Sequence, residues 1–403
     1  PKETVTYDGE GKTLLPGLID SHVHITMIPG EPFRSDSADQ RKQRHAQDLQ
    51  SYLAWGVTTI VDPGITIEDV ELIKELTEKG PSPAFHVIGP LLGPEHGYPS
   101  VITKFEGISS KEEVIQRLDE YAFLQPIGVK ITMEDGHMGS IWPLLDEDMR
   151  SFISEQCDSR NQPKYIHAMD AKMTRAALQM QPHALVHASK NGGRRLAREI
   201  AEQNVYVVTT LDIYGSPLIQ WNRSMLSHPN IAFTVPSDAI DLIYDPDTIK
   251  KSKDVFLTVN APWLPLWISQ RMMNQRSYKA MLKQASTMIG HLNQEGVQLV
   301  LGSDSGGWPI LTFMLHGPTT HLEIDLLFEA GLSAQDIITA STQRPAKMLG
   351  LENEVGSIKE GLRADLLIVE GNPLEDISVI HNPVWVVRAG EIRTPKEWMF
   401  NSK

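Results

Sequence analysis

Cysteine is nearly absent from this chain, and long apolar runs are missing altogether. The 403 residues contain one cysteine, Cys157, which excludes an internal disulfide and leaves the redox compartment open. No apolar run approaches the ~18 residues that a membrane-spanning helix needs. No signal peptide opens the chain, although Pro1 indicates that a segment precedes it. The compartment is therefore unknown, with the cytoplasm favoured over the periplasm.

Positive charge is also in short supply. The chain has 37 Lys and Arg against 51 Asp and Glu, a formal net charge of −14. This balance disfavours nucleic acid or an anionic membrane surface as the main partner. We therefore expect a small-molecule substrate.

Eight short apolar runs alternate with amphipathic, helix-like segments. Strands separated by helices pair in parallel, and continuous apolar strands are buried on both faces. Eight such units predict an α/β fold of the (β/α)₈ TIM-barrel type, with an open doubly wound sheet as the alternative. The eight runs are 14–25, 56–64, 84–93, 128–132, 164–169, 184–189, 204–210 and 297–307.

The barrel is expected to span residues 14–350, with an insertion at 211–296. This insertion is rich in Trp, Met, Tyr and Pro, which is typical of a lid or an oligomer contact, so a homo-oligomer is one expectation. From residue 351 to 403 the pattern changes to short strands with Gly turns, and residues 1–13 read the same way. We predict that these two ends form a small β-sandwich, whose N-terminal part is truncated.

Polar side chains stand at the ends of several runs. On a strand, His22 and His24 point the same way and can share one metal ion. Alone, a histidine is more often a packing residue, and a strand-end aspartate is often a helix cap. In a barrel, however, strand ends meet at one rim, and this mixture of donors suits zinc-like ions. The expected metal ligands are His22, His24, Lys130, His167, His187 and Asp304.

Lys130 lies inside the apolar run GVKIT. Burial lowers the pKa of an ammonium group and favours the neutral amine. A neutral amine can react with carbon dioxide to give a carbamate, an anionic ligand that can bridge two metal ions. The alternative is an ion pair between Lys130 and Glu134 or Asp135.

Five motifs occur in a characteristic order: PGLIDSHVHI, GVKI, YIHAMD, ALVHAS and LGSDSGG. Together they resemble the amidohydrolase superfamily, and the C-terminal tail is similar to its imidazolonepropionase-like and Xaa-dipeptidase branch. The resemblance covers nearly the whole chain apart from 211–296. It implies a metal-bearing (β/α)₈ barrel with a small β-sandwich.

The resemblance also implies two divalent metal ions, zinc above all. One ion would be held by His22, His24, Lys130 and Asp304, and the other by Lys130, His167 and His187. Imidazolonepropionase lacks the bridging lysine and uses one metal, so the lysine favours the binuclear, peptidase-like branch. The deaminase branch has a glutamate shortly after the strand-five histidine, where this chain has Asp170.

The expected activity is metal-dependent hydrolysis of an amide bond in a peptide or an N-acyl amino acid. Two cations lower the pKa of a shared water, so a bridging hydroxide attacks the carbonyl. Asp304 is the expected general base and acid, which passes the proton to the leaving amine. The alternatives are a mononuclear hydrolase of a cyclic amide or a lactone, and a catalytically silent scaffold of the same fold.

Loops that follow three of the runs overhang the same rim. Loop residues at the mouth of a barrel commonly contact substrate. The expected substrate contacts are His96, Tyr98, Glu134, His137, Tyr214 and Arg223.

Overall fold

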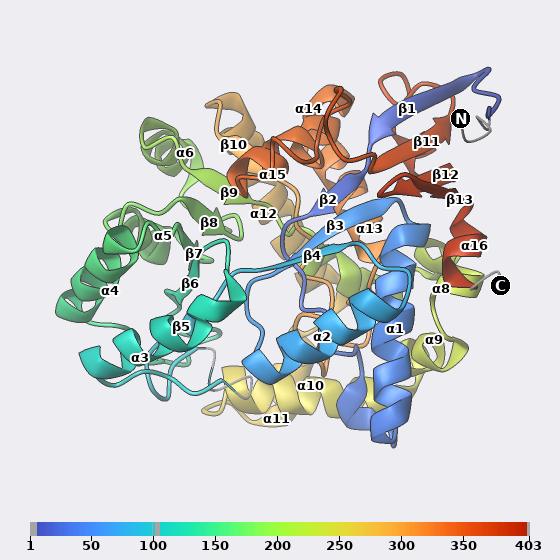
Figure 1. The fold of residues 1–403 in the computed structure, drawn as a ribbon. Coiled ribbons are helices and arrows are strands. Elements are labelled where there is room, and N and C mark those ends of the chain that lie inside the picture. Colours follow the sequence, from blue (N-terminus) through green and yellow to red (C-terminus); the bar gives the residue numbers. More distant parts are fainter. Residues whose placement is uncertain (1–5, 99, 101–104, 401–403) are drawn as a thin grey trace.

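The computed structural model describes residues 6–98, 100 and 105–400, so residues 1–5 of the expected N-terminal segment lie outside the described residues. Parallel strands form two sheets at the centre of the molecule (Figure 1). The larger sheet has the order β10-β9-β8-β7-β6-β5, and the smaller one has the order β2-β3-β4. Their bounds are β2 Leu18–Asp20, β3 Val57–Asp62, β4 Ala84–Val87, β5 Leu91–Leu92, β6 Val129–Thr132, β7 Lys164–His167, β8 Ala184–Val186, β9 Tyr206–Val208 and β10 Gln298–Val300.

The two sheets are linked at both edges. The run 84–93 supplies β4, which pairs with β3, and β5, which pairs with β6. The run is interrupted next to Pro90, which has no N–H to donate to a strand partner. At the opposite edge, Ser21 N donates to Leu301 O at 3.1 Å, and Val23 forms a parallel bridge with Ser305. The predicted α/β fold with parallel strands is confirmed.

The first and last runs are shorter strands than the sequence predicts. The run 14–25 divides at Gly17, where an added Cβ would lie 2.2 Å from Thr58 Oγ1. Residues before this close approach belong to β1 (Lys12–Pro16) of a different sheet, and β2 ends at Asp20. His22 and His24 therefore lie beyond β2, and Asp304 lies beyond the end of β10.

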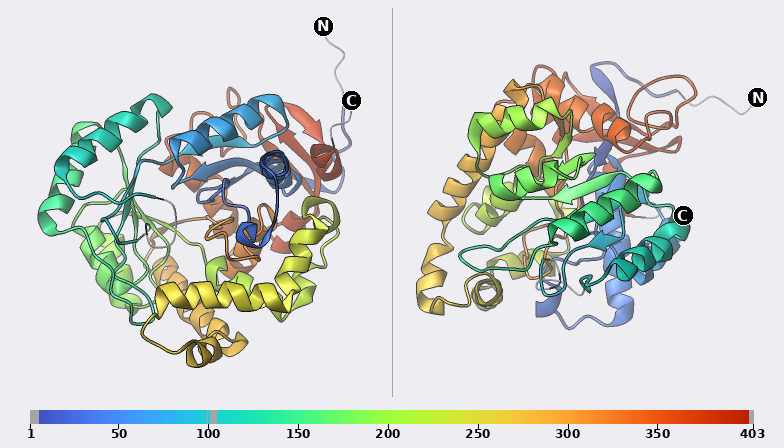
Figure 2. Two further views of the ribbon diagram at one scale, coloured as in Figure 1. Left: turned by 90° about the horizontal axis from the view of Figure 1, so that it is seen from below. Right: turned by 90° about the vertical axis from the view of Figure 1, so that its left-hand side faces the viewer.

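Helices cover the outside of both sheets, as the left view of Figure 2 shows. Their starts follow ordinary capping chemistry: Ser37 and Gln40 form a capping box at α1. These helices are α1 Ala38–Ala54, α2 Ile67–Lys79, α3 Lys111–Tyr121, α4 Glu147–Ser159, α5 Ala171–Leu178, α6 Gly193–Glu202, α13 Pro318–Glu329, α14 Ala334–Ala340 and α15 Gln343–Met348, with short 3₁₀ turns η1 Glu31–Phe33 and η2 Ala122–Leu124.

The segment 211–296 is helical. Its last helix, α12, packs against α6 and β10, whereas α10 and α11 lie along the lower edge of the molecule in Figure 1. None of the described helices combines the length and apolarity needed to cross a bilayer. The elements are α7 Asp212–Gly215, η3 Ser216–Gln220, η4 Arg223–Leu226, α8 Ile231–Thr234, α9 Ser237–Tyr244, α10 Pro246–Asn260, α11 Leu266–Met272 and α12 Gln275–Gln294.

The two chain ends meet in one antiparallel sheet with the order β1-β11-β12-β13. The first and last described elements, β1 and α16, lie on this side of the molecule (Figure 1). The sheet joins strands from both chain ends, as the sequence predicts, whereas the sandwich remains a prediction; α16 packs between β12 and α1. The remaining bounds are β11 Leu366–Glu370, η5 Ile377–His381, β12 Pro383–Arg388, β13 Glu391–Arg393 and α16 Pro395–Met399.

Candidate metal centre

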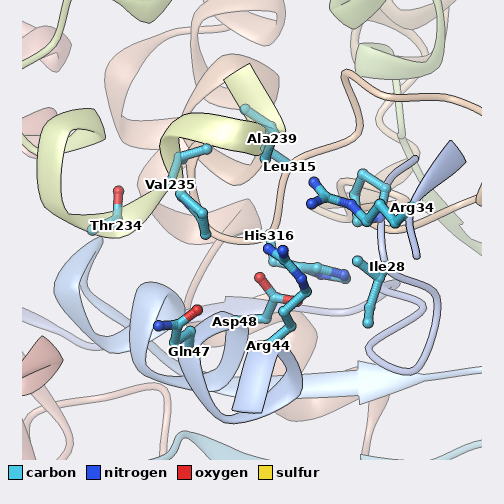
Figure 3. A pocket seen from close by; sticks show the side chains of 12 residues that line it. Ile28, Arg34, Arg44, Gln47, Asp48, Thr234, Val235, Ala239, Leu315 and His316 are labelled. Atoms are coloured by element: carbon cyan, nitrogen blue, oxygen red, sulfur yellow. The ribbon is translucent and has the colours of Figure 1, made fainter. Parts of the chain in front are cut away.

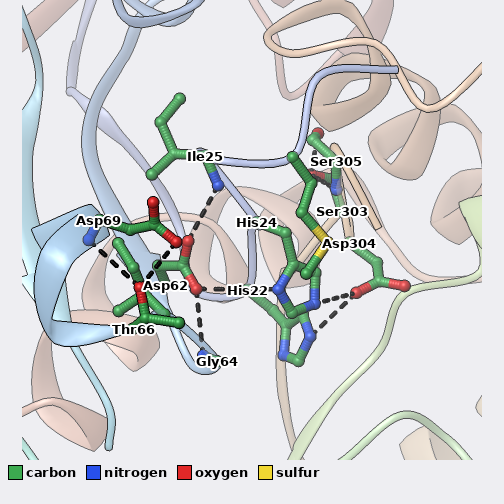
Figure 4. A network of polar contacts seen from close by, with 12 residues as sticks. His22, His24, Ile25, Asp62, Gly64, Thr66, Asp69, Ser303, Asp304 and Ser305 are labelled. Carbon is green, nitrogen blue, oxygen red and sulfur yellow. Dashed lines mark hydrogen bonds and ion pairs between the residues drawn. The ribbon is translucent and has the colours of Figure 1, made fainter. Parts of the chain in front are cut away.

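Asp304 and the two histidines of the HVH motif meet at one point (Figure 4). Asp304 Oδ1 lies 2.9 Å from His22 Nε2 and 3.1 Å from His24 Nε2. The bridge between Val23 and Ser305 aligns the two segments, and Asp304 N donates to His22 O at 2.7 Å. Asp304 has a φ of 54°, in the left-handed region, which turns the chain just after β10.

Two further histidines extend the cluster. The ring of His187 lies 5.0 Å from that of His22 and 4.6 Å from that of His167, measured between centroids. Donor atoms of His22, His187 and Asp304 lie within 4.8 Å of one another, as the ligands of one ion would. His187 Nδ1 contacts Thr210 Oγ1 at 2.7 Å, so its other ring nitrogen is left for a ligand.

Lys130 lies on β6 and is only 3% exposed. Burial lowers the pKa of its amine to about 7, against the opposing effects of Asp304 and Asp62. Its positive charge in turn lowers the pKa of His22 and of His167. Lys130 is therefore close enough to these histidines for its charge to affect their pKa values.

The protonation states of three of these histidines and of Asp304 suit metal binding. Burial lowers the pKa of His22 to about 3 and holds those of His167 and His187 well below the usual range, so these rings are neutral. Burial opposes ionisation of Asp304, but hydrogen bonds with His22 and His24 hold the pKa of this carboxyl well below its usual range. Neutral imidazoles beside an ionised carboxylate are the forms that bind a cation.

Several buried atoms of this cluster have no hydrogen-bond partner. Buried polar atoms are nearly always paired, so several unpaired ones in one place indicate a ligand-binding site. All four come from side chains that the sequence assigns to this site, and the electron pairs of the histidine nitrogens fit a divalent cation. The unpaired atoms are His22 Nδ1, His24 Nδ1, Glu134 Oε2 and His167 Nε2.

The sequence interpretation overlooked Asp62 and Thr210. Asp62 Oδ1 lies 3.7 Å from His24 Nδ1, and the Asp62 carboxylate accepts from Ile25 N and Gly64 N (Figure 4). Both residues stand at or just after the end of a parallel strand. The strand-end rule that selected the histidines could have found them as well.

Four of the six expected substrate contacts lie beside His167 or Glu134 or respond to the charge of Glu134. Tyr98 stacks on this ring at 4.4 Å and 23°, and Glu134 Oε2 lies 3.6 Å from His167 Nε2. His137 Nδ1 is 3.7 Å from Glu134 Oε1. The buried Tyr214 has an unpaired hydroxyl, and burial together with the charge of Glu134 raises its pKa.

The other two expected substrate contacts, His96 and Arg223, show no polar or ring contact with this cluster in the described part of the chain. The His96 side chain is 85% exposed beside Glu95, and Arg223 stacks 4.1 Å from the ring centroid of Tyr244. Within the described residues, no hydrogen bond, ion pair or ring contact joins either to the cluster. Loop position alone could not separate them from the four that do approach it.

A small cavity of about 30 Å³ lies between α1 and the segment 234–239 (Figure 3). Arg34, Arg44 and Asp48 supply its charges, and Arg34 Nε and Asp48 Oδ2 are unpaired. Its size is that of a buried water site. No expected site residue lines it.

Solved structures share this fold over nearly the whole chain. A Xaa-Pro dipeptidase with methionine in its active site has a TM-score of 0.71 at 19% identity, with 95% of this chain and 87% of that chain covered. A prolidase in complex with N-methylphosphonate-L-proline has a TM-score of 0.69 at 18% identity, with 98% and 90% covered. The ochratoxinase of A. niger has a TM-score of 0.68 at 17% identity, with 97% and 86% covered.

Among curated proteins, the chain matches part of a 5-methylthioadenosine/S-adenosylhomocysteine deaminase from Teredinibacter turnerae. The two are 31% identical over 110 residues, which are 26% of this chain and 24% of the relative. The match thus spans about a quarter of that protein. The model of the amidohydrolase family matches residues 13–392, and the chain therefore belongs to the amidohydrolase family, as its motifs predict.

Proposed function

We propose that this chain is a metal-dependent hydrolase that cleaves an amide bond of a peptide or an N-acyl amino acid. One observation carries the proposal: neutral imidazoles and an ionised carboxylate meet after the ends of different parallel strands, with unpaired donor atoms. Membership of the amidohydrolase family supports hydrolysis. We also infer that the two linked parallel sheets are arcs of one eight-stranded barrel.

The donor set fits two divalent cations, with zinc the best match to imidazole and carboxylate ligands. His22, His24 and Asp304 would hold one, His167 and His187 the other, and a carbamate on Lys130 would join them. Such cations lower the pKa of water and polarise a carbonyl group. The pKa of about 7 for Lys130 supports the carbamate, because an appreciable share of neutral amine is present near neutral pH.

Within the chain, Asp304 is the proposed proton-transfer residue. Its side chain is 16% exposed, so it touches both the buried histidines and the solvent-accessible side of the site. A carboxylate in this position can take a proton from attacking water and deliver it to the leaving amine. His22 and His24 fix its orientation through the contacts to Oδ1.

Deamination is less well supported. The matching relative is a deaminase, but the residue three positions after His167 is Asp170, whose side chain caps α5 by accepting from Met173 N at 2.8 Å. A carboxylate engaged as a helix cap is not available to shuttle protons at the site. The dipeptidase and prolidase folds among the similar structures agree with amide hydrolysis.

A mononuclear hydrolase of a cyclic amide or a lactone is the second candidate. It is favoured by the compact set of His22, His187 and Asp304, which brings three donors together around a single point. The two candidates differ in the role of Lys130. Metal content distinguishes them: in the binuclear enzyme Lys130→Met lowers bound zinc, whereas the exposed control Lys172→Met does not.

The experiment that tests the function is a hydrolysis screen. The zinc-loaded protein is assayed against dipeptides, N-acyl amino acids, lactones and 5-methylthioadenosine. We expect cleavage within the first two classes and its loss after metal removal. Turnover of only the nucleoside or only the lactones, or of no compound by fully metal-loaded protein, would overturn the proposal.

Self-association is a further part of the proposal. Trp263 and Trp267 are each 62% exposed, and Met272 is 49% exposed, all within the 211–296 segment. Large exposed apolar side chains of this kind are enriched at protein interfaces. A small molecule remains the proposed substrate.

A further inference from the structure

Glu134 is a buried carboxylate with an unpaired oxygen beside the proposed metal centre. Its side chain is 2% exposed, and Oε2 has no hydrogen-bond partner. It follows β6 by two positions, so it stands at the same end of the parallel strands as the histidines. An ionised group this deeply buried is costly to fold unless something pairs with it.

The protein itself supplies little to pair with it. No lysine or arginine among the described residues lies within 4.0 Å of the Glu134 carboxylate. Burial raises the pKa of the Glu134 carboxyl, and the opposing effects of His137, Lys190 and the Gly136 N–H do not offset this rise, so a cation bound beside the carboxyl would favour its ionised form. His137 is the nearest base at 3.7 Å, but burial lowers the pKa of its ring to about 4, so it carries no charge near neutral pH.

The unpaired oxygen points toward the reaction site. Glu134 Oε2 lies 3.6 Å from His167 Nε2, and His167 packs against His187. The unpaired hydroxyl of Tyr214 is close enough for its pKa to respond to the charge of Glu134. His137 is 21% exposed, so this part of the cluster is in contact with solvent and open to a ligand.

We propose that Glu134 binds the free ammonium group of the substrate. This inference rests on the proposed function and narrows its substrate class to compounds with a free amine on the acyl side of the scissile bond, as in a dipeptide. N-acyl amino acids lack this charge and would leave the carboxylate unpaired.

The test measures kcat/KM for a set of L-alanyl dipeptides and for the N-acetylated form of each. The proteins compared are zinc-loaded wild type, Glu134→Gln and Asp135→Asn. Asp135 is the matched control, because it is the adjacent carboxylate and pairs with the exposed Lys172 at 2.5 Å. We expect wild type and Asp135→Asn to favour the free amine in kcat/KM by about 30-fold or more, and Glu134→Gln to lose this preference.

Bound zinc and calorimetric binding of L-alaninamide are measured on the same samples. We expect unchanged zinc in Glu134→Gln and weaker L-alaninamide binding, with N-acetyl-L-alaninamide unaffected. Three results would each overturn the inference. Wild type could use free and acetylated dipeptides equally, the preference for the free amine could survive in Glu134→Gln, or that variant could lose zinc. If no dipeptide is cleaved by zinc-loaded protein, the proposed function fails, and the L-alaninamide titration still decides the role of Glu134.

Discussion

At the scale of single residues, protonation state determines what the site can do. His22, His167 and His187 stay neutral because they are buried, and Asp304 stays ionised because two imidazoles contact it. The sequence alone identified these four residues as candidate ligands, because each stands at or near the end of an apolar run. The sequence could not show which atoms are unpaired, since that depends on contacts such as the one between His187 and Thr210.

Replacing Asp304 with Asn tests its proposed role in proton transfer. The amide keeps the shape of the side chain but cannot accept a proton as a carboxylate does. We expect kcat to fall by about 10²- to 10⁴-fold with the fold intact. Near-normal turnover by Asp304→Asn with metals bound would contradict the assignment; circular dichroism of the same sample serves as the folding control.

Asp48 should make stability depend on pH. Burial raises the pKa of this carboxyl from 3.8 to about 7, against weaker opposing effects of His45, Arg44 and Arg34. Because the folded protein holds the proton more tightly than the unfolded chain, the stabilisation is present below about pH 4 and is lost as the pH rises toward 7. The shift corresponds to at most about 4 kcal/mol.

The variant Asp48→Asn removes this titration. We expect its free energy of unfolding to fall less than that of wild type between pH 5 and pH 8, measured by urea denaturation. Parallel pH profiles for the two proteins would show that Asp48 does not titrate in this way.

At the scale of elements, the site depends on how α13 holds the end of β9. Glu323 on α13 accepts from Thr209 Oγ1 at 2.5 Å and from Asp212 N at 2.8 Å. Between these two anchors lies Thr210, which contacts His187. The periodic pattern predicted the parallel strands, but not this link, because it joins residues more than a hundred positions apart.

Glu323→Ala should therefore loosen both the fold and the site. Leaving the buried Thr209 and Asp212 donors unpaired costs about 1–3 kcal/mol each in the free energy of unfolding. We expect zinc affinity to fall as well, because His187 loses its positioning contact. Glu329→Ala, on the exposed end of the same helix, is the control and should change stability by less than about 0.5 kcal/mol. Equal stability and zinc affinity in both variants would contradict this role of α13.

At the scale of the whole molecule, both chain ends are needed for one small sheet. Leu14 pairs with Ile368, so the first described strand is completed by residues near the opposite end of the chain. Trp398 is 2% exposed and donates from Nε1 to Val386 O at 3.0 Å, which fixes α16 on this sheet. Gly-turn patterns predicted the antiparallel strands at both ends, but no pattern indicated that Lys12–Pro16 would separate from Leu18–Asp20 at Gly17.

Trp398→Ala tests this closure. Removing a buried tryptophan costs about 3–5 kcal/mol, so we expect a clear drop in the unfolding midpoint. Phe400→Ala is the matched control, because Phe400 is 55% exposed and its loss should be nearly neutral. Equal midpoints for the two variants would mean that the chain-end sheet unfolds independently of the parallel sheets.

The central claim is that these side chains form a metal centre that the reaction needs. Its most direct test is to measure zinc per chain and dipeptide hydrolysis on one preparation, before chelation, after chelation and after zinc is returned. The account predicts about two zinc ions per chain, loss of zinc and hydrolysis together, and recovery of both. Undiminished hydrolysis by metal-free protein, or less than about half an equivalent of zinc bound under zinc-replete conditions, would contradict it.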